Sequence, residues 1–169
     1  YLFKNLEYDI LANHLFTNAK TLIYAGLFFK GKEADKWYQT GIAIFDHELK
    51  EQILLDGGHF ELSPMYHSIF LEDLLDLISL ADSFPKTISG AVVQEWRYLA
   101  VKMLDWLKYM SHPDGNISFF NDATEGIAPN YMQLVFYANK IGFEYFDTKP
   151  RLGLVHLAES GYIRFNSDG

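Results

Sequence analysis

The sequence contains no cysteine and has little positive charge, with 14 lysines and arginines against 22 aspartates and glutamates. Without cysteine, disulfides and thiolate chemistry are excluded, and cysteine usage gives no information on the redox compartment. The formal charge of −8 argues against a nucleic-acid-binding surface, because such a surface requires clustered lysine and arginine. The charge does not exclude an anionic substrate, since a local cleft can be neutral or positive on an otherwise acidic protein.

Signals for targeting and for membrane insertion are also missing. The start of the chain has no basic segment followed by an apolar segment and a small-residue cleavage site. No apolar run reaches membrane-spanning length. The chain starts at Tyr1 inside a helix-like run and stops after a strand-like run and a turn signal in SGYIRFNSDG. These ends predict an internal segment of a larger protein, so that any site in it can be incomplete.

The sequence does have a high apolar content, because 49% of its 169 residues are hydrophobic, which is enough to build a core. Apolar residues recurring at spacings of three and four predict helices over residues 6–29, 34–54, 64–81, 91–110 and 130–141. After Lys149 and Pro150 the pattern changes to strand-like runs at residues 152–157 and 162–165. We therefore expect a mainly α fold, with antiparallel helices over residues 1–148 and the start of a β domain over residues 149–169.

The segment DGGHFELSPMYH, residues 56–67, carries an unusual concentration of reactive side chains between two helix-like runs. Ser63 followed by Pro64 is typical of an N-cap and a first helical position, which places Tyr66 and His67 in the first turn of the next helix. The positive end of the helix dipole favours the phenolate form of a tyrosine and the neutral form of a histidine, and it attracts anions. A core tyrosine is the alternative for Tyr66; the Gly-rich loop and the adjacent histidine favour a functional one.

Three separated motifs resemble the heparinase II/III family of polysaccharide lyases and its alginate-lyase relatives. They are NHLFTNAKTLIYAGLFF, DGGHFELSPMYHSIFLEDLLDL and PDGNISFFNDATEGIAP, in this order and spacing. The resemblance implies that residues 1–148 are the later part of an incomplete (α/α) toroid and that residues 149–169 begin an antiparallel β-sandwich. It also implies an acidic polysaccharide as the partner, with the cleft between the two domains.

The resemblance implies β-elimination next to a uronic acid and assigns roles to four residues. Asn13 neutralises the uronate carboxylate, and His14 assists it or serves as a base for one sugar epimer. Tyr66 protonates the leaving oxygen and in some relatives also removes the C5 proton, while His67 aids Tyr66 or binds substrate. A further catalytic histidine or tyrosine belongs to a later part of such proteins. From periodicity alone, Asn13 and His14 lie on the polar face of their helix, and an ordinary solvated face would look the same.

Four more residues are secondary candidates for substrate binding. His59 and Glu61 are expected to contact the substrate or to support residues that do. As a metal pair they are weak, because no third and fourth ligands follow at a typical spacing, so neither a metal nor a cofactor is expected. Asn121 and Asp122 are typical of a turn, and the resemblance leaves them as candidates because the matching loop borders the cleft.

Two other classes of function remain open. A glycoside hydrolase on a helical toroid would need two carboxylates facing the bond, for which Asp56 and Glu61 are candidates, but it gives the Tyr–His pair no task. A non-catalytic carbohydrate-binding or assembly protein could keep the same fold.

Few lysines or arginines adjoin the motifs, and Arg97 is helical, so a less sulfated polysaccharide is favoured. A periplasmic or secreted location is favoured, and the oligomeric state is open. Packing is expected of Trp37, Trp96 and Trp106, and no role is assigned to His47, His112 and His156.

Overall fold

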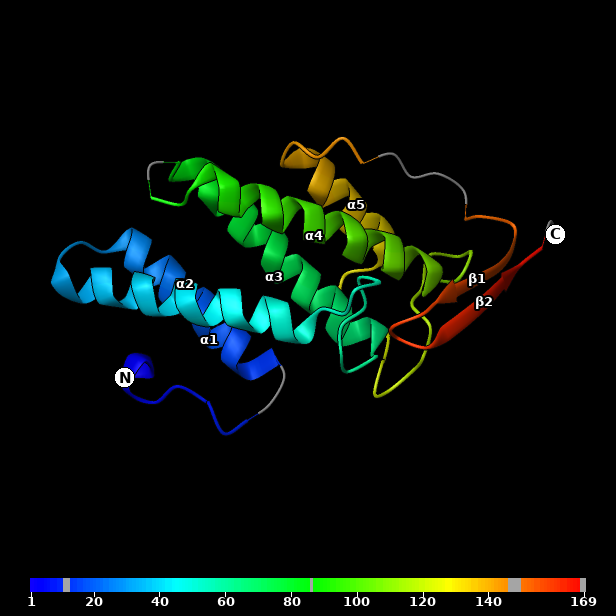
Figure 1. Ribbon diagram of the computed structural model, residues 1–169, viewed down its shortest axis with the longest axis horizontal. Helices are drawn as coiled ribbons and strands as arrows, with labels where there is room; N and C mark the ends of the chain where they lie inside the picture. Colours follow the sequence, from blue (N-terminus) through cyan, green and yellow to red (C-terminus); the bar gives the residue numbers. More distant parts are fainter. Residues whose placement is uncertain (11–12, 86, 146–149, 168–169) are drawn as a thin grey trace. The chain divides into compact units, whose positions relative to one another are not determined.

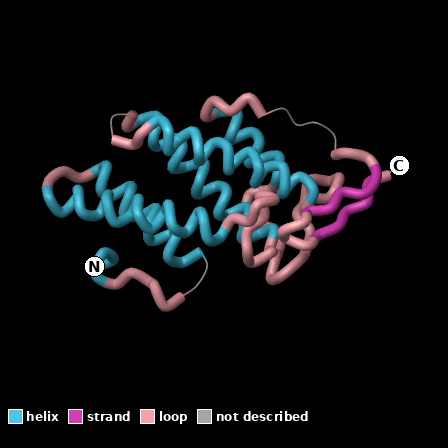
Figure 2. Tube along the Cα trace, in the orientation of Figure 1, coloured by secondary structure: helices cyan, strands magenta, loops and turns pink. Residues whose placement is uncertain are grey.

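The computed structural model describes residues 1–10, 13–85, 87–145 and 150–167. The chain divides into two compact units, residues 1–52 and 53–169, each of which is considered by itself (Figure 1). The described residues form five α-helices, one short 3-10 helix and two strands, so the fold is mainly α with a small sheet near the end of the chain (Figure 2). The predicted boundary between residues 148 and 149 lies outside the described residues, and the assignment of the two domains stays a prediction.

The first unit consists of a short 3-10 helix, Leu2–Lys4, and two packed helices, α1 (Asn13–Phe28) and α2 (Lys32–Gln52). Phe16 and Phe45 pack against each other with ring centroids 4.6 Å apart. Gly41 of α2 lies so near α1 that a Cβ there would be 2.9 Å from the carbonyl oxygen of Ala19. Small residues therefore set the close approach of these two helices.

The prediction that the first helix starts at residue 6 is wrong, because α1 starts at Asn13. The backbone N–H of Glu7 donates to Oδ1 of Asn18 at 3.2 Å, and Nδ2 of Asn18 donates to Oε2 of Glu7 at 2.8 Å. A buried side chain of α1 therefore binds a backbone group that a helix would have used. Periodicity alone does not reveal such a contact.

The second unit contains α3 (Pro64–Ser83), α4 (Gly90–Tyr109) and α5 (Tyr131–Lys140), packed side by side (Figure 1). As its apolar circumference predicted, α3 is buried on most sides, with Leu71, Leu74 and Leu75 fully inaccessible. Side-chain caps define the helix starts: Ser63, Ser89 and Asn130 each accept a backbone N–H of the first turn. All four helices after residue 30 start and end within two residues of their predicted bounds, and these caps account for the starts of α3, α4 and α5.

The sheet is an antiparallel pair, β1 (Gly153–Leu157) and β2 (Tyr162–Asn166), with Leu157 opposite Tyr162. Nη1 of Arg164 donates to the carbonyl oxygens of Tyr109 and Ser111, so β2 is tied to the C-terminal end of α4. Loops of this unit gather beside the two strands (Figure 2). Of the described helices, none has the length and apolar character required to span a membrane.

Candidate functional site

The loop that precedes α3 is a compact structure built against α4. Ile53 and His59 form an antiparallel bridge, and the N–H of Leu54 donates to the carbonyl of Gly58 at 2.8 Å. Gly57 has φ +93°, and a Cβ at this position would overlap the backbone carbonyl of Lys102. A Cβ at the next glycine would lie 2.6 Å from Nε1 of Trp106. The glycine pair therefore does more than end a helix, because it lets the loop lie directly on α4.

The placement of Tyr66 and His67 in the first turn of α3 is confirmed. Ser63 is the N-cap, with Oγ accepting from the backbone N–H of Tyr66 at 3.4 Å, and Pro64 occupies the first helical position. Between residues 63 and 68, all of which the structure describes, Tyr66 alone is not fully buried. The capped turn thus carries one partly exposed tyrosine on an otherwise buried stretch.

His67 is a buried residue that belongs to the core of the second unit. Its Nδ1 accepts the backbone N–H of His59 at 3.3 Å, and its Nε2 lies 3.0 Å from the carbonyl oxygen of Met103, so the proton resides on Nε2. The ring stacks on Trp106 with centroids 4.5 Å apart. Burial, helped by His59, lowers the pKa of His67 to about 3. Both predicted roles of His67, assistance to Tyr66 and substrate binding, stay predictions.

His59 is equally inaccessible, whereas Glu61 keeps some exposure. The backbone N–H of Glu61 donates to Nδ1 of His59 at 3.4 Å, and burial lowers the pKa of His59 to about 4. The ring centroid of His59 lies 5.0 Å from that of Phe60 and 5.0 Å from that of Phe70. His59 is thus a buried residue packed between two phenylalanine rings, and the roles predicted for His59 and Glu61 at the substrate stay predictions.

These two neutral histidines predict a loss of stability in acid. In the unfolded chain both take up a proton near their ordinary pKa of 6.5, whereas in the folded chain they do so only at about 4 and about 3. Between these values the unfolded state binds more protons, so the free energy of unfolding falls by up to about 1.4 kcal/mol per histidine per pH unit as the pH decreases.

Urea denaturation of the chain between about pH 8 and about pH 5 measures this slope. We expect His67→Gln to reduce the slope, because glutamine has no titratable ring. A slope equal to that of the unmodified chain would contradict the assignment of His67 as a buried neutral group.

Residues from the far end of the unit hold the loop, and sequence reasoning did not assign them to the site. Oδ2 of Asp56 accepts from the backbone N–H of Ser160 at 2.7 Å and from its Oγ at 2.8 Å, while Nε1 of Trp106 donates to Oγ of Ser160 at 2.9 Å. The hydroxyl of Tyr162 donates to the carbonyl of Leu62 at 2.8 Å. Asp56 and Ser160 are 104 residues apart in sequence, and Leu62 and Tyr162 are 100 apart. The SGY motif signals only a hairpin turn.

Asn121 and Asp122 form a turn, as predicted, and both have positive φ, 47° and 63°. Nδ2 of Asn121 donates to the carbonyls of Glu61 and Leu62 at 3.3 and 3.2 Å. Asn121 thus contacts the loop before α3, and Asp122 is exposed. Their binding of substrate stays a prediction.

Asn13 and His14 lie at the start of α1 in the first unit. Asn13 is partly exposed; His14 is half-exposed, with its Nδ1 3.6 Å from Oε1 of Glu7. Tyr66 and His67 belong to the second unit. That the four residues share one cleft stays a prediction.

Asp56, one of the two candidate carboxylates of the hydrolase alternative, uses both of its oxygens in hydrogen bonds that hold the loop. Oδ1 of Asp56 accepts the N–H of Gly58 at 3.0 Å, and Oδ2 accepts two bonds from Ser160. This carboxylate is therefore a fixed acceptor that holds the loop.

Trp96 and Trp106 are buried, as predicted for packing residues, and Trp37 contacts Phe29 edge to face.

One set of possible metal donors occurs among the described residues: His47, Glu48 and Glu51 of α2, with donor atoms within 4.8 Å of one another. Glu48 already accepts from Nε2 of Gln52 at 2.5 Å, and Nδ1 of His47 lies 3.3 and 3.4 Å from the two carboxylates. Hydrogen bonding within one helix accounts for this arrangement.

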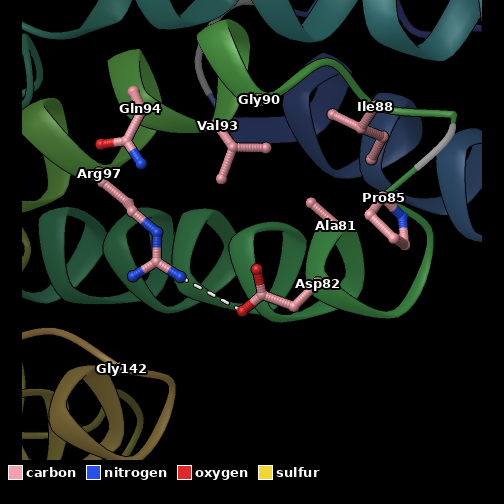
Figure 3. Close-up of a pocket in the computed structure, with 9 residues that line it drawn as sticks. All are labelled: Ala81, Asp82, Pro85, Ile88, Gly90, Val93, Gln94, Arg97 and Gly142. Carbon is pink, nitrogen blue, oxygen red and sulfur yellow. Dashed lines mark hydrogen bonds and ion pairs between the residues drawn. The ribbon is translucent and has the colours of Figure 1, made fainter.

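A cavity of about 480 Å³ opens between the end of α3 and the start of α4 (Figure 3). Its cation, Arg97, donates to Asp82 at 3.2 Å and to the carbonyl of Ile141 at 3.1 Å, and it lies over the ring of Phe143. Because α3 rises about 1.5 Å per residue, Asp82 lies about 24 Å along the helix from Tyr66. The cavity is therefore separate from Tyr66, and its arginine is already engaged.

Comparison with known proteins gives the context of this site. Residues 1–146 match the family described as Heparinase II/III N-terminus. A heparin-sulfate lyase of Bacteroides stercoris is 37% identical over 123 residues, which are 69% of this chain and 17% of that protein. A heparin-sulfate lyase of Pedobacter heparinus is 31% identical over 124 residues, which are 69% of this chain and 18% of that protein. The chain thus spans less than a fifth of these relatives.

Solved structures show the same fold. A heparinase III structure with methylated lysines superposes with a TM-score of 0.68 at 25% identity, covering 96% of this chain and 26% of that one. The heparan sulfate lyase HepC of Pedobacter heparinus gives a TM-score of 0.64 at 23% identity, covering 98% and 27%. The predicted fold, helices of an incomplete toroid followed by the first strands of a β domain, is confirmed. Because the family match extends over residues 1–146, the chain belongs to the heparinase II/III N-terminus family.

Proposed function

We propose that the polypeptide containing this chain is a polysaccharide lyase that cleaves next to a uronic acid by β-elimination. The observation that carries the proposal is Tyr66, a partly exposed tyrosine on the capped and otherwise buried first turn of α3, in a chain of this family. The substrate we propose is a uronate polymer of the heparan sulfate kind with few sulfates. Two relatives are named heparin-sulfate lyases, and the chain is acidic, with Arg97 and Arg164 engaged in internal bonds.

The reaction breaks the C5–H and C4–O bonds of the uronate and forms a C4–C5 double bond. The C5 proton is weakly acidic, so negative charge that develops toward the carboxylate must be stabilised in the transition state. We assign that task to the amide of Asn13, assisted by His14. We assign acceptance of the C5 proton to a histidine or tyrosine of a later part of the polypeptide. Tyr66 gives its own hydroxyl proton to the departing C4 oxygen, which is general acid catalysis by a positioned phenol.

The test is an elimination assay on the full-length polypeptide with heparan sulfate, heparin and alginate as substrates. The unsaturated product absorbs in the ultraviolet, and we expect the absorbance to rise fastest with heparan sulfate. New reducing ends without absorbance would indicate a hydrolase. Retention on immobilised heparan sulfate with neither signal would indicate a non-catalytic binding protein, and both results contradict the proposal.

Asn13→Ala tests the proposed carboxylate neutraliser. Removing one pre-organised donor from a developing oxyanion costs on the order of 100-fold in kcat, and we expect a loss of that size here. Asn5→Ala is the matched control, because Asn5 is an exposed asparagine of the same unit whose side-chain amide donates to the carbonyl of Tyr1 at 2.9 Å. Equal kcat values for the two variants would remove Asn13 from its role.

A further inference from the structure

Leu62, directly before the N-cap of α3, has a left-handed backbone with φ 58°. A branched side chain rarely adopts this conformation, and a residue keeps it only when its surroundings hold it there. Leu62 precedes Ser63 and lies four residues before Tyr66. Any relaxation of Leu62 would therefore move the cap on which the first turn of α3 depends.

Three hydrogen bonds hold the backbone around Leu62. Its N–H donates to the carbonyl of His59 at 2.9 Å, which closes a turn. Its own carbonyl accepts the hydroxyl of Tyr162 at 2.8 Å and Nδ2 of Asn121 at 3.2 Å. The tyrosine bond is the shorter of the two side-chain contacts, and it comes from a strand rather than a loop.

Tyr162 is itself fixed in place. It is the first residue of β2 and pairs with Leu157. Its ring centroid lies 4.9 Å from that of Phe120 and 6.1 Å from that of Trp106. Two residues earlier, Ser160 binds Asp56 at the other end of the loop. The hairpin thus holds both ends of the loop, at Asp56 and at Leu62.

We propose that Tyr162 is a positioning residue for Tyr66, acting through the carbonyl of Leu62. The inference rests on the proposed function, since it assumes that Tyr66 takes part in the reaction. A catalytic group must be held close to its productive geometry, and a small displacement lowers turnover more than binding. The hydroxyl of Tyr162 provides that hold by keeping Leu62 left-handed.

Tyr162→Phe in the full-length polypeptide removes the hydroxyl and keeps the ring. We expect kcat on heparan sulfate to fall about 10-fold while KM changes by less than about two-fold. Tyr137→Phe is the matched control, because it removes a tyrosine hydroxyl that donates to Asp76 at 2.6 Å, outside the loop. Equal kcat values for Tyr162→Phe and Tyr137→Phe would overturn the inference.

A double variant tests whether the hold acts through the backbone of Leu62. Glycine adopts positive φ freely, so Leu62→Gly removes the energetic cost of the left-handed backbone at this position. In this background we expect Tyr162→Phe to lower kcat by less than about three-fold, because the two effects are coupled. If Tyr162→Phe lowered kcat about 10-fold both in the unmodified polypeptide and in the Leu62→Gly variant, Tyr162 would act by another route, and the inference would be overturned.

Hydrogen exchange separates this inference from the proposed function. We expect Tyr162→Phe to speed amide exchange in residues 59–67, and Tyr137→Phe to leave that segment unchanged. Absence of elimination by the unmodified polypeptide on every uronate polymer would refute the proposed function, and the positioning inference with it. Faster exchange of residues 59–67 in Tyr162→Phe would then still show that the hydrogen bond from Tyr162 to Leu62 stabilises the loop. Unchanged exchange in this variant would overturn the inference, whatever the elimination activity.

Discussion

Tyr66→Phe is expected to remove the proposed elimination activity of the full-length polypeptide almost completely, with a loss in kcat of about 1,000-fold. A positioned general acid contributes about 100- to 10,000-fold, and phenylalanine has no proton to give to the departing oxygen. The fold should persist, because Ser63 caps the helix through the backbone N–H of Tyr66 and not through its side chain. The rate at which the ultraviolet absorbance of the unsaturated product increases measures the effect, and circular dichroism checks that the variant is folded.

Tyr98→Phe serves as the control for that experiment. Tyr98 is an exposed tyrosine of α4 with Lys102 over its ring, and losing its hydroxyl should leave kcat within about two-fold of the unmodified value. A Tyr66→Phe variant that retains more than about a tenth of the activity would remove Tyr66 from proton transfer.

Gly57→Ala is expected to lower the free energy of unfolding by about 3 kcal/mol. About 1 kcal/mol comes from placing a Cβ on a backbone with φ +93°. The rest comes from overlap of that Cβ with the carbonyl of Lys102, which belongs to a helix backbone and moves only at a cost of about 1 to 3 kcal/mol. Urea denaturation of the chain, followed by tryptophan fluorescence, gives the difference.

Gly115→Ala separates these two costs. Gly115 has φ +90°, nearly the same conformation, but a Cβ there has nothing within 4 Å. This variant should lose only the conformational part, about 1 kcal/mol. If both variants lost the same stability, the close approach of the loop to α4 would not be a constraint on the fold.

The helices after residue 30 could be predicted because their signals are local. A serine or asparagine cap and the spacing of apolar residues act within one or two turns, and these features define α3, α4 and α5. The start of the first helix could not be predicted in the same way. Before α1, Glu7 is bound by Asn18, a contact between residues eleven positions apart that apolar spacing does not reveal.

In the candidate site too, local signals predicted one residue correctly and gave no information on the surroundings of its neighbour. Ser63 and Pro64 were sufficient to place Tyr66 in the first turn of α3. The sequence placed His67 beside it as a possible partner in binding, and nothing local indicates that its ring is enclosed by Trp106 and bonded to Met103. Two adjacent residues of a helix point in different directions, and which one is buried depends on what packs against each side.

The sequence by itself determined the helical character of the chain, the capped turn that carries Tyr66 and the motifs of its family. Only the tertiary structure decided that His59 and His67 are buried and neutral, that Asp56 is an acceptor for Ser160, and that Tyr162 holds Leu62. The physical reason is range. Capping and periodicity act between near neighbours, whereas burial and these hydrogen bonds require segments up to about a hundred residues apart to meet, which no local pattern specifies.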